Sequence, residues 1–282
     1  MNGVEVVRAG ALTTVQDLGR PGHAHVGVPH SGALDRPAHA LANRLLGNPE
    51  GAATLETTLD GVALRALAPV TVAVTGAPCP VRLDGRPAAW GAPVRVPAGA
   101  VLDVGRAAAG VRSYVAVRGG VAVPEVLGSR STDLLSGLGP AVLVAGAVLP
   151  VGVPVGPVAG VDAVGSRSPL PELVLPVLAG PRDDWFAPGA LFSRSYRVAS
   201  ASNRIGLRTE GGPALARTRS GELPSEGMVL GAVQVPPDGL PVVFLADHPV
   251  TGGYPVIGVV PPPSLALAAQ ARPGTPLLFT PA

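Results

Sequence analysis

The sequence predicts a mainly β protein with a few short helices, built as a barrel or a sandwich and organised as two β-rich halves. Apolar residues occur in short runs that Gly and Pro interrupt, which is typical of the short strands of barrels and sandwiches. Gly (38) and Pro (33) make up about a quarter of the chain, a share that can indicate disorder, but 47% of the residues are hydrophobic. A disordered chain lacks this hydrophobicity, so we interpret Gly and Pro as turn residues.

The predicted strands are runs rich in Val, Leu and Ala that end at turn residues. They are Val70–Thr75, Val111–Arg118, Leu173–Leu178, Tyr196–Ala199, Val242–Ala246 and Val256–Val260.

The clearest predicted helix spans Asp35–Leu46. Asp35 suits the N-cap, Pro37 suits the first turn, the Ala and Leu residues form one apolar stripe, and Gly47 suits the C-terminal end. Shorter helices are predicted at Thr132–Leu138, Asp183–Phe192 and Ser264–Ala271.

The expected division of the chain places an N-terminal half at 1–155 and a C-terminal half at 172–282. The linker between them, about 156–171, has no hydrophobic period and carries several turn signals.

Composition excludes several classes of function. The single cysteine, Cys79, cannot form an internal disulfide, and the N-terminus shows no signal-peptide pattern, so we expect a cytoplasmic protein. No apolar run reaches the length of a membrane-spanning helix. The 21 Arg are dispersed and aromatics are few, which argues against a nucleic-acid partner. Because the chain contains no lysine, lysine Schiff bases and lysine bases are impossible.

Three segments concentrate polar residues among glycines: Thr13–Asp35, Gly119–Gly139 and Pro224–Tyr254. His23, His25 and His30 in the first segment have no further ligand at metal spacing, so no metal is expected. The Gly-x-Ser-x-Gly elbow of serine hydrolases is missing. Arg130 lies in a Gly-Ser-Arg-Ser-Thr loop that suits an anion or, alternatively, a helix cap.

The third segment is the strongest candidate. Gln234 and Asp238 flank a rigid Val-Pro-Pro turn, and Asp247 ends a predicted strand. Asp accepts hydrogen bonds and Gln both donates and accepts, so the group suits an amide, urea or lactam, although a hairpin with polar turns is the alternative. We also expect Asp247→Ala to abolish turnover with little change in thermal stability, because carboxylates at strand ends seldom hold a core together.

Three stretches resemble the biotin-dependent carboxyltransferase family, which includes allophanate hydrolase subunit 2-like proteins and the C subunit of 5-oxoprolinase. They are TTVQDLGRPGHAHVGVPHSGALDRPAHALANRLLGNPEGAATLE, YVAVRGGVAVPEVLGSRSTDLLSGLG and ELPSEGMVLGAVQVPPDGLPVVFLADHPVTGGYPVIG, in the family's order. The resemblance implies a cyclophilin-like β-barrel architecture. It also implies a hetero-complex with B-like and A-like subunits that opens 5-oxoproline to glutamate with ATP.

Two alternatives remain open within the resemblance: a carboxyltransferase subunit that moves carboxyl from carboxybiotin to urea or a related amide, and a non-catalytic regulatory partner of a B-like protein. No covalent cofactor is expected, since ATP would act through the complex and biotin would arrive on another protein. The expected catalytic residues are Asp247, Asp238 and Gln234. The expected substrate-binding residues are Ser31, Asp35, Arg130, Ser131, Thr251, Gly252, Gly253 and Tyr254.

Overall fold

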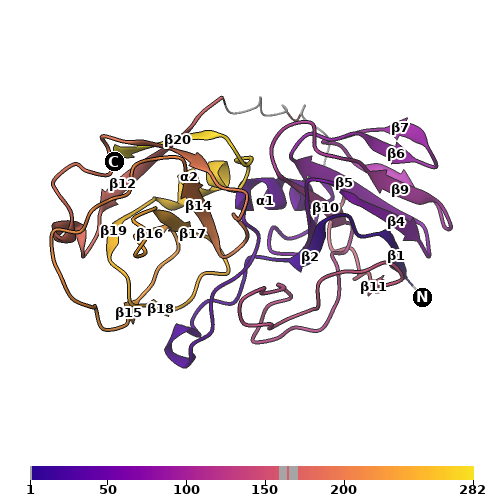
Figure 1. Cartoon of the computed structure of the whole chain (residues 1–282). Helices are drawn as coiled ribbons and strands as arrows, with labels where there is room; N and C mark the ends of the chain where they lie inside the picture. The colour runs from indigo at the N-terminus through magenta and orange to yellow at the C-terminus, as the bar shows by residue number, and fades with distance from the viewer. Residues whose placement is uncertain (1, 159–163, 165–170) are drawn as a thin grey trace. The chain divides into compact units, whose positions relative to one another are not determined.

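The computed structural model describes residues 2–158, 164 and 171–282. These residues form two compact units (Figure 1). Unit 1 comprises Met1–Arg20, Asp35–Thr132 and Gly137–Pro169, and unit 2 comprises Pro21–Leu34, Asp133–Ser136 and Leu170–Ala282. The expected boundaries at 155 and 172 stay a prediction, and most of the expected linker, 159–163 and 165–170, lies outside the described residues.

Unit 1 contains two sheets and one helix. The first sheet has the order β11-β1-β4-β9-β6-β7 and the second the order β2-β3-β10-β5-β8. The bounds are β1 Gly3–Arg8, β2 Leu12–Gln16, β3 Thr54–Thr58, β4 Val62–Ala66, β5 Val70–Gly76, β6 Val81–Leu83, β7 Arg86–Ala88, β8 Val94–Val96, β9 Val101–Val104, β10 Arg112–Val117 and β11 Val148–Pro150.

One apolar cluster, rich in Val and Leu from strands of both sheets, forms the core of unit 1. Helix α1 (Arg36–Leu45) packs on β5 and β10 of the second sheet. Every residue of β10 is buried, because one face of the strand lies on the core and the other meets the helix. This explains why β10 appears in the sequence as a continuous apolar run without alternation.

Helix α1 begins and ends with the capping residues that the sequence predicts. The Asp35 carboxylate accepts a hydrogen bond of 3.1 Å from the backbone N–H of Ala38, and Pro37 lies in the first turn. Gly47 follows with φ of 68°, the left-handed conformation that glycine adopts without strain.

Unit 2 is a closed barrel with the strand order β12-β19-β16-β17-β14-β13-β20. Strands β12 and β20 pair in parallel and the other neighbours are antiparallel. The bounds are β12 Leu173–Ala179, β13 Ser195–Val198, β14 Gly206–Glu210, β16 Ala232–Gln234, β17 Val242–Phe244, β19 Val256–Val259 and β20 Pro276–Pro281.

Smaller elements complete unit 2. Strands β15 (Glu226–Gly227) and β18 (Thr251–Gly252) form a separate ribbon, and two 3₁₀ turns occur at η1 (Ala24–Val26) and η2 (Asp183–Trp185). Helix α2 (Pro262–Ala268) contributes Leu265 and Ala268 to the apolar cluster that forms the core of the unit.

The mainly β prediction, with a barrel and few helices, is confirmed. Each of the six predicted strands overlaps an observed strand over more than half of its length. The predicted helix at Thr132–Leu138 is wrong. A hydrogen-bonded turn occupies this segment, in which the Asp133 carboxylate accepts from the N–H groups of Leu135 and Ser136. The only helical part of Asp183–Phe192 is the η2 turn, and α2 begins two residues before and ends three residues before the helix expected at Ser264–Ala271. No helix among the described residues is both long and apolar enough to cross a membrane.

Candidate functional site

A buried ion pair lies where the chain leaves strand β17 in unit 2. Asp247, which follows β17 by three residues, is fully buried, and the side chain of Arg204 is 1% exposed. The Arg204 guanidinium donates to both carboxylate oxygens, with Nε to Oδ2 at 2.9 Å and Nη2 to Oδ1 at 2.8 Å. The backbone N–H of Asp247 also donates to the Arg204 carbonyl at 3.1 Å. Side chain and backbone therefore fix these two residues to each other.

Two further segments of unit 2 are tied to this pair. Ser31 Oγ donates to Asp247 Oδ1 at 2.7 Å, and the N–H of Leu134 donates to Oδ2 at 3.1 Å. Arg204 Nη2 also donates to the carbonyl of Gly32 at 2.8 Å. One carboxylate thus joins Pro21–Leu34, Asp133–Ser136 and the end of β17, segments that are far apart in the sequence.

Ser31 has a strained backbone. Its φ is 54°, a left-handed conformation that non-glycine residues seldom adopt. The N–H of Ser31 donates to the carbonyl of Ala246 at 3.0 Å, and its hydroxyl binds Asp247. Such strain persists only where surrounding contacts over-determine the conformation, and it is concentrated at functional sites.

The geometry of Asp247 suits positioning better than proton transfer. Each carboxylate oxygen accepts two hydrogen bonds, which uses the lone pairs that a base or a substrate acceptor would need. Removal of a fully buried, paired charge also costs far more than removal of an exposed one. The burial of Asp247 therefore reverses our expectation that Asp247→Ala would leave thermal stability almost unchanged.

His248 lies beside the ion pair. Its ring stacks on Phe244 with centroids 6.0 Å apart. Burial lowers the pKa of His248, and the neighbouring His30 lowers this pKa further, so the ring is neutral at neutral pH. Nδ1 lies 2.8 Å from the carbonyl oxygen of Pro249. Because a carbonyl only accepts, Nδ1 carries the hydrogen and Nε2 the lone pair.

Gln234 and the glycine-rich turn form a second group in unit 2. Gln234 Nε2 donates to the carbonyl of Tyr254 at 3.4 Å and lies 4.0 Å from the sulfur of Met228. A Cβ on Gly252 would come within 2.8 Å of the same nitrogen, so a side chain there would displace Gln234. Met228 and Phe244 belong to one small apolar cluster, which links this group to His248.

Tyr254 presents an accessible ring in this second group. It is 44% exposed, and the Arg217 guanidinium lies 5.9 Å from the ring centroid. Asp238 has a local role instead, because its Oδ1 accepts from the N–H of Leu240 in an exposed turn. Thr251 and Gly253 are both exposed. The structure thus brings Gln234, Gly252 and Tyr254 together, and no described contact brings Asp238 to them.

Three predicted site residues belong to unit 1. Arg130 and Ser131 lie in a loop that closes around the carboxylate of Asp17, which accepts from Ser129 Oγ, Ser131 Oγ and the Arg130 N–H at 2.5–2.7 Å. The Arg130 guanidinium pairs with Glu125 at 2.7 Å. This loop is therefore held by an internal carboxylate.

Asp35 is the third of these residues. It caps α1, and its backbone N–H donates to the Tyr114 hydroxyl at 2.7 Å. Tyr114 in turn donates to Glu56 at 2.7 Å. Burial raises the pKa of Tyr114 well above its usual value, so the hydroxyl keeps its proton.

Two central residues were missed from the sequence. Arg204 is one of 21 Arg, and nothing in its local sequence separates it from the exposed ones. Asp17 stands in a polar segment, but its partners Ser129 and Ser131 lie more than 100 residues away. Within the described part of the chain, no three His, Cys, Asp or Glu residues gather in a way that would hold a metal ion.

Comparison with known proteins places the chain in a family. The family described as carboxyltransferase domain, subdomain A and B, matches residues 26–281. The C subunit of the Escherichia coli 5-oxoprolinase is 38% identical over 98% of this chain and 90% of its own length. A urea amidolyase of Lachancea kluyveri is 35% identical over 98% of this chain, which corresponds to only 17% of that protein.

A solved structure gives the same result for the fold. The crystal structure of TTHA0988 matches 99% of this chain with a TM-score of 0.89 and 38% identity. The chain spans 55% of the length of that protein. The match to the family model and the 38% identity over nearly the full length of both chains lead to one conclusion: the chain belongs to the carboxyltransferase domain family, subdomains A and B.

Proposed function

We propose that this chain is the C subunit of an ATP-dependent 5-oxoprolinase, which opens 5-oxo-L-proline to L-glutamate together with B-like and A-like subunits. One observation carries the proposal. The chain corresponds to 90% of the C subunit in E. coli but to 17% of a urea amidolyase. The chain therefore matches almost the whole length of a separate subunit, whereas it matches only a small part of the urea enzyme.

The chemistry of unit 2 is compatible with a lactam substrate. A lactam offers one N–H donor and one carbonyl acceptor, and the Gln234 amide can pair with both kinds of group. Gly252 lets the backbone approach closely, and Tyr254 offers an accessible ring. In this proposal Asp247 and Arg204 position Ser31 and the segments around it. The complex as a whole hydrolyses ATP, and the proposal gives no residue of this chain a role in that hydrolysis.

Reconstitution tests the proposal. The chain is mixed with its A-like and B-like partners, 5-oxoproline and ATP, and glutamate is measured over time. We expect glutamate only when the chain and ATP are both present. If circular dichroism shows that all three proteins are folded and no glutamate forms, the proposal is wrong.

A second function, carboxyl transfer from carboxybiotin to urea or a similar amide, is favoured by the family and by the urea amidolyase match. In that case biotin arrives on another protein, because a chain without lysine cannot carry it covalently. Transfer of labelled carboxyl to urea, in the presence of a biotinylated carrier protein, would support this function over the first.

A further inference from the structure

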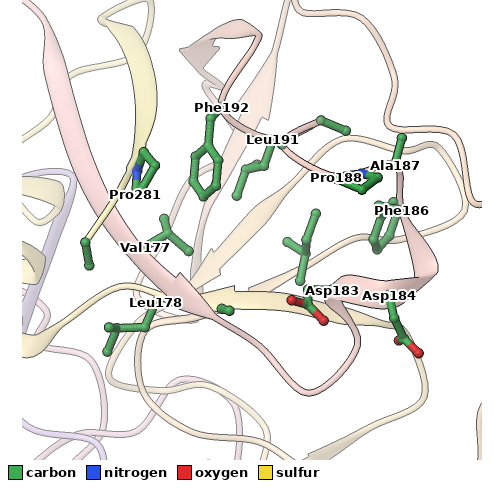
Figure 2. Close-up of a pocket in the computed structure, with 15 residues that line it drawn as sticks. Val177, Leu178, Asp183, Asp184, Phe186, Ala187, Pro188, Leu191, Phe192 and Pro281 are labelled. Carbon is green, nitrogen blue, oxygen red and sulfur yellow. The ribbon is translucent and has the colours of Figure 1, made fainter.

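Unit 2 contains a pocket of about 440 Å³ (Figure 2). None of the residues that line it belongs to the Asp247 or Gln234 groups. Its volume falls in the range of roughly 300–1,000 Å³ that is typical of small-molecule sites. One wall is the end of β12 with the last residues of β20, and the other is the turn-rich segment Phe186–Phe192. Backbone hydrogen bonds order this second wall, among them Ala190 N–H to Ala187 carbonyl at 3.0 Å and Phe192 N–H to Gly189 carbonyl at 3.0 Å.

Most of the lining is apolar, and it includes aromatic rings. The chain has four Phe, and two of them, Phe186 and Phe192, line this pocket. Phe192 is 37% exposed, whereas the other three Phe are at most 6% exposed. An exposed aromatic ring does not contribute the favourable free energy that burial of its apolar surface would give. A bound apolar group would cover this ring.

Two carboxylates give the pocket its polarity. Figure 2 shows Asp183 and Asp184 together at one end, with Val177, Leu191, Phe192 and Pro281 grouped on the other side. Asp184 is paired with Arg219 at 2.6 Å, with both side chains about half exposed. Arg182 also lies near Asp184, but Glu226 pairs with it, so three acidic and two basic groups leave this end with a net negative charge. Carboxylates only accept hydrogen bonds, so the matching ligand group is a cationic donor.

We propose that this pocket binds a small hydrophobic ammonium compound, with its apolar body against Phe192 and Leu191 and its ammonium group at Asp183 and Asp184. This site is independent of the proposed function, because it shares no residue with the Gln234 and Asp247 groups.

Calorimetric titration of the full chain with 2-phenylethylammonium tests the proposal, with 3-phenylpropionate as the anionic probe of similar size. We expect saturable binding of the amine and weaker or no binding of the acid. In Asp183→Asn/Asp184→Asn the affinity for the amine should fall about fivefold, the upper range for exposed ion pairs. Glu222→Gln, which removes an exposed charge outside the pocket, should bind as the wild type does.

A second variant tests the apolar part of the site. Phe192→Ser should weaken binding of the amine while leaving the melting temperature close to that of the wild type, because the ring is already partly exposed. The proposal is overturned if the acid binds as tightly as the amine. It is also overturned if binding does not saturate, or if neither variant changes the affinity. These outcomes do not bear on glutamate formation.

Discussion

Replacement of Arg204 by Met should destabilise unit 2 by about 3–5 kcal/mol, the usual cost of breaking a buried ion pair from one side. The structure places this change at the upper end of single substitutions, because the two side chains are 1% and 0% exposed. Met fills much of the Arg volume but donates no hydrogen bond. Asp247 would then keep the hydrogen bonds from the Ser31 hydroxyl and the Leu134 N–H but lose the guanidinium that balances its charge.

Urea denaturation followed by tryptophan fluorescence measures this change. The chain has two Trp, Trp90 in unit 1 and Trp185 in unit 2. In a Trp90→Phe background the signal therefore reports on unit 2. Arg208→Met is the matched control: it removes an exposed Arg from the neighbouring strand β14 and should change stability by less than about 0.5 kcal/mol.

The double variant Arg204→Met/Asp247→Leu separates loss of a charge pair from loss of packing. Replacement of both partners leaves no uncompensated buried charge, so the double variant should lose less stability than the sum of the single ones. Suppose that Arg204→Met lowers the free energy of unfolding by less than about 1 kcal/mol and leaves the slope of this free energy against urea concentration unchanged. The Arg204–Asp247 pair would then not hold Pro21–Leu34, Asp133–Ser136 and the end of β17 in place.

Three further changes have defined outcomes. Asp35→Ala should lower the free energy of unfolding by about 0.5–2 kcal/mol in thermal denaturation, because the N–H of Ala38 loses its cap, whereas Asp35→Asn should lose less. Burial lowers the pKa of His39 from 6.5 to about 4, so the neutral form stabilises the fold fully above pH 6.5 and this contribution is lost as the pH falls toward 4. The loss should reach about 3 kcal/mol in urea titrations, and His39→Gln should remove this pH dependence; an identical dependence in the variant would contradict the assignment. Gly252→Ala should displace Gln234 and lower kcat/KM for 5-oxoproline in the reconstituted enzyme without loss of folding, and unchanged kinetics would exclude Gln234 from the site.

Local signals in the sequence predicted local structure well. Helix α1 was predictable because its cap, its proline and its closing glycine all act within the helix itself. Strand β10 was predictable because it is buried on both faces. The helix expected at Thr132–Leu138 does not form, and the N–H of Leu134 donates to Asp247 instead of joining a helix. That carboxylate lies 113 residues further along the chain, so local pattern could not show it.

The candidate site shows the same limit. The sequence predicted Ser31 and Asp247 as site residues, and the structure joins their side chains by a hydrogen bond of 2.7 Å. It could not identify Arg204, because the pairing of β14 with β17 brings this Arg to a carboxylate 43 residues away in the sequence. Arg130 and Ser131 share the composition of the site but are bound to Asp17 in unit 1. Composition therefore located the polar segments, whereas pairing between distant residues required the structure.

A comparison of two substrates in one reconstituted mixture tests directly whether the chain is a 5-oxoprolinase subunit. The chain and its A-like and B-like partners receive 5-oxoproline or urea, with ATP, bicarbonate and a biotinylated carrier protein. Glutamate released and labelled bicarbonate incorporated are measured side by side. We expect ATP-dependent glutamate from 5-oxoproline and no labelled product from urea. Labelled product from urea without glutamate from 5-oxoproline would contradict this expectation.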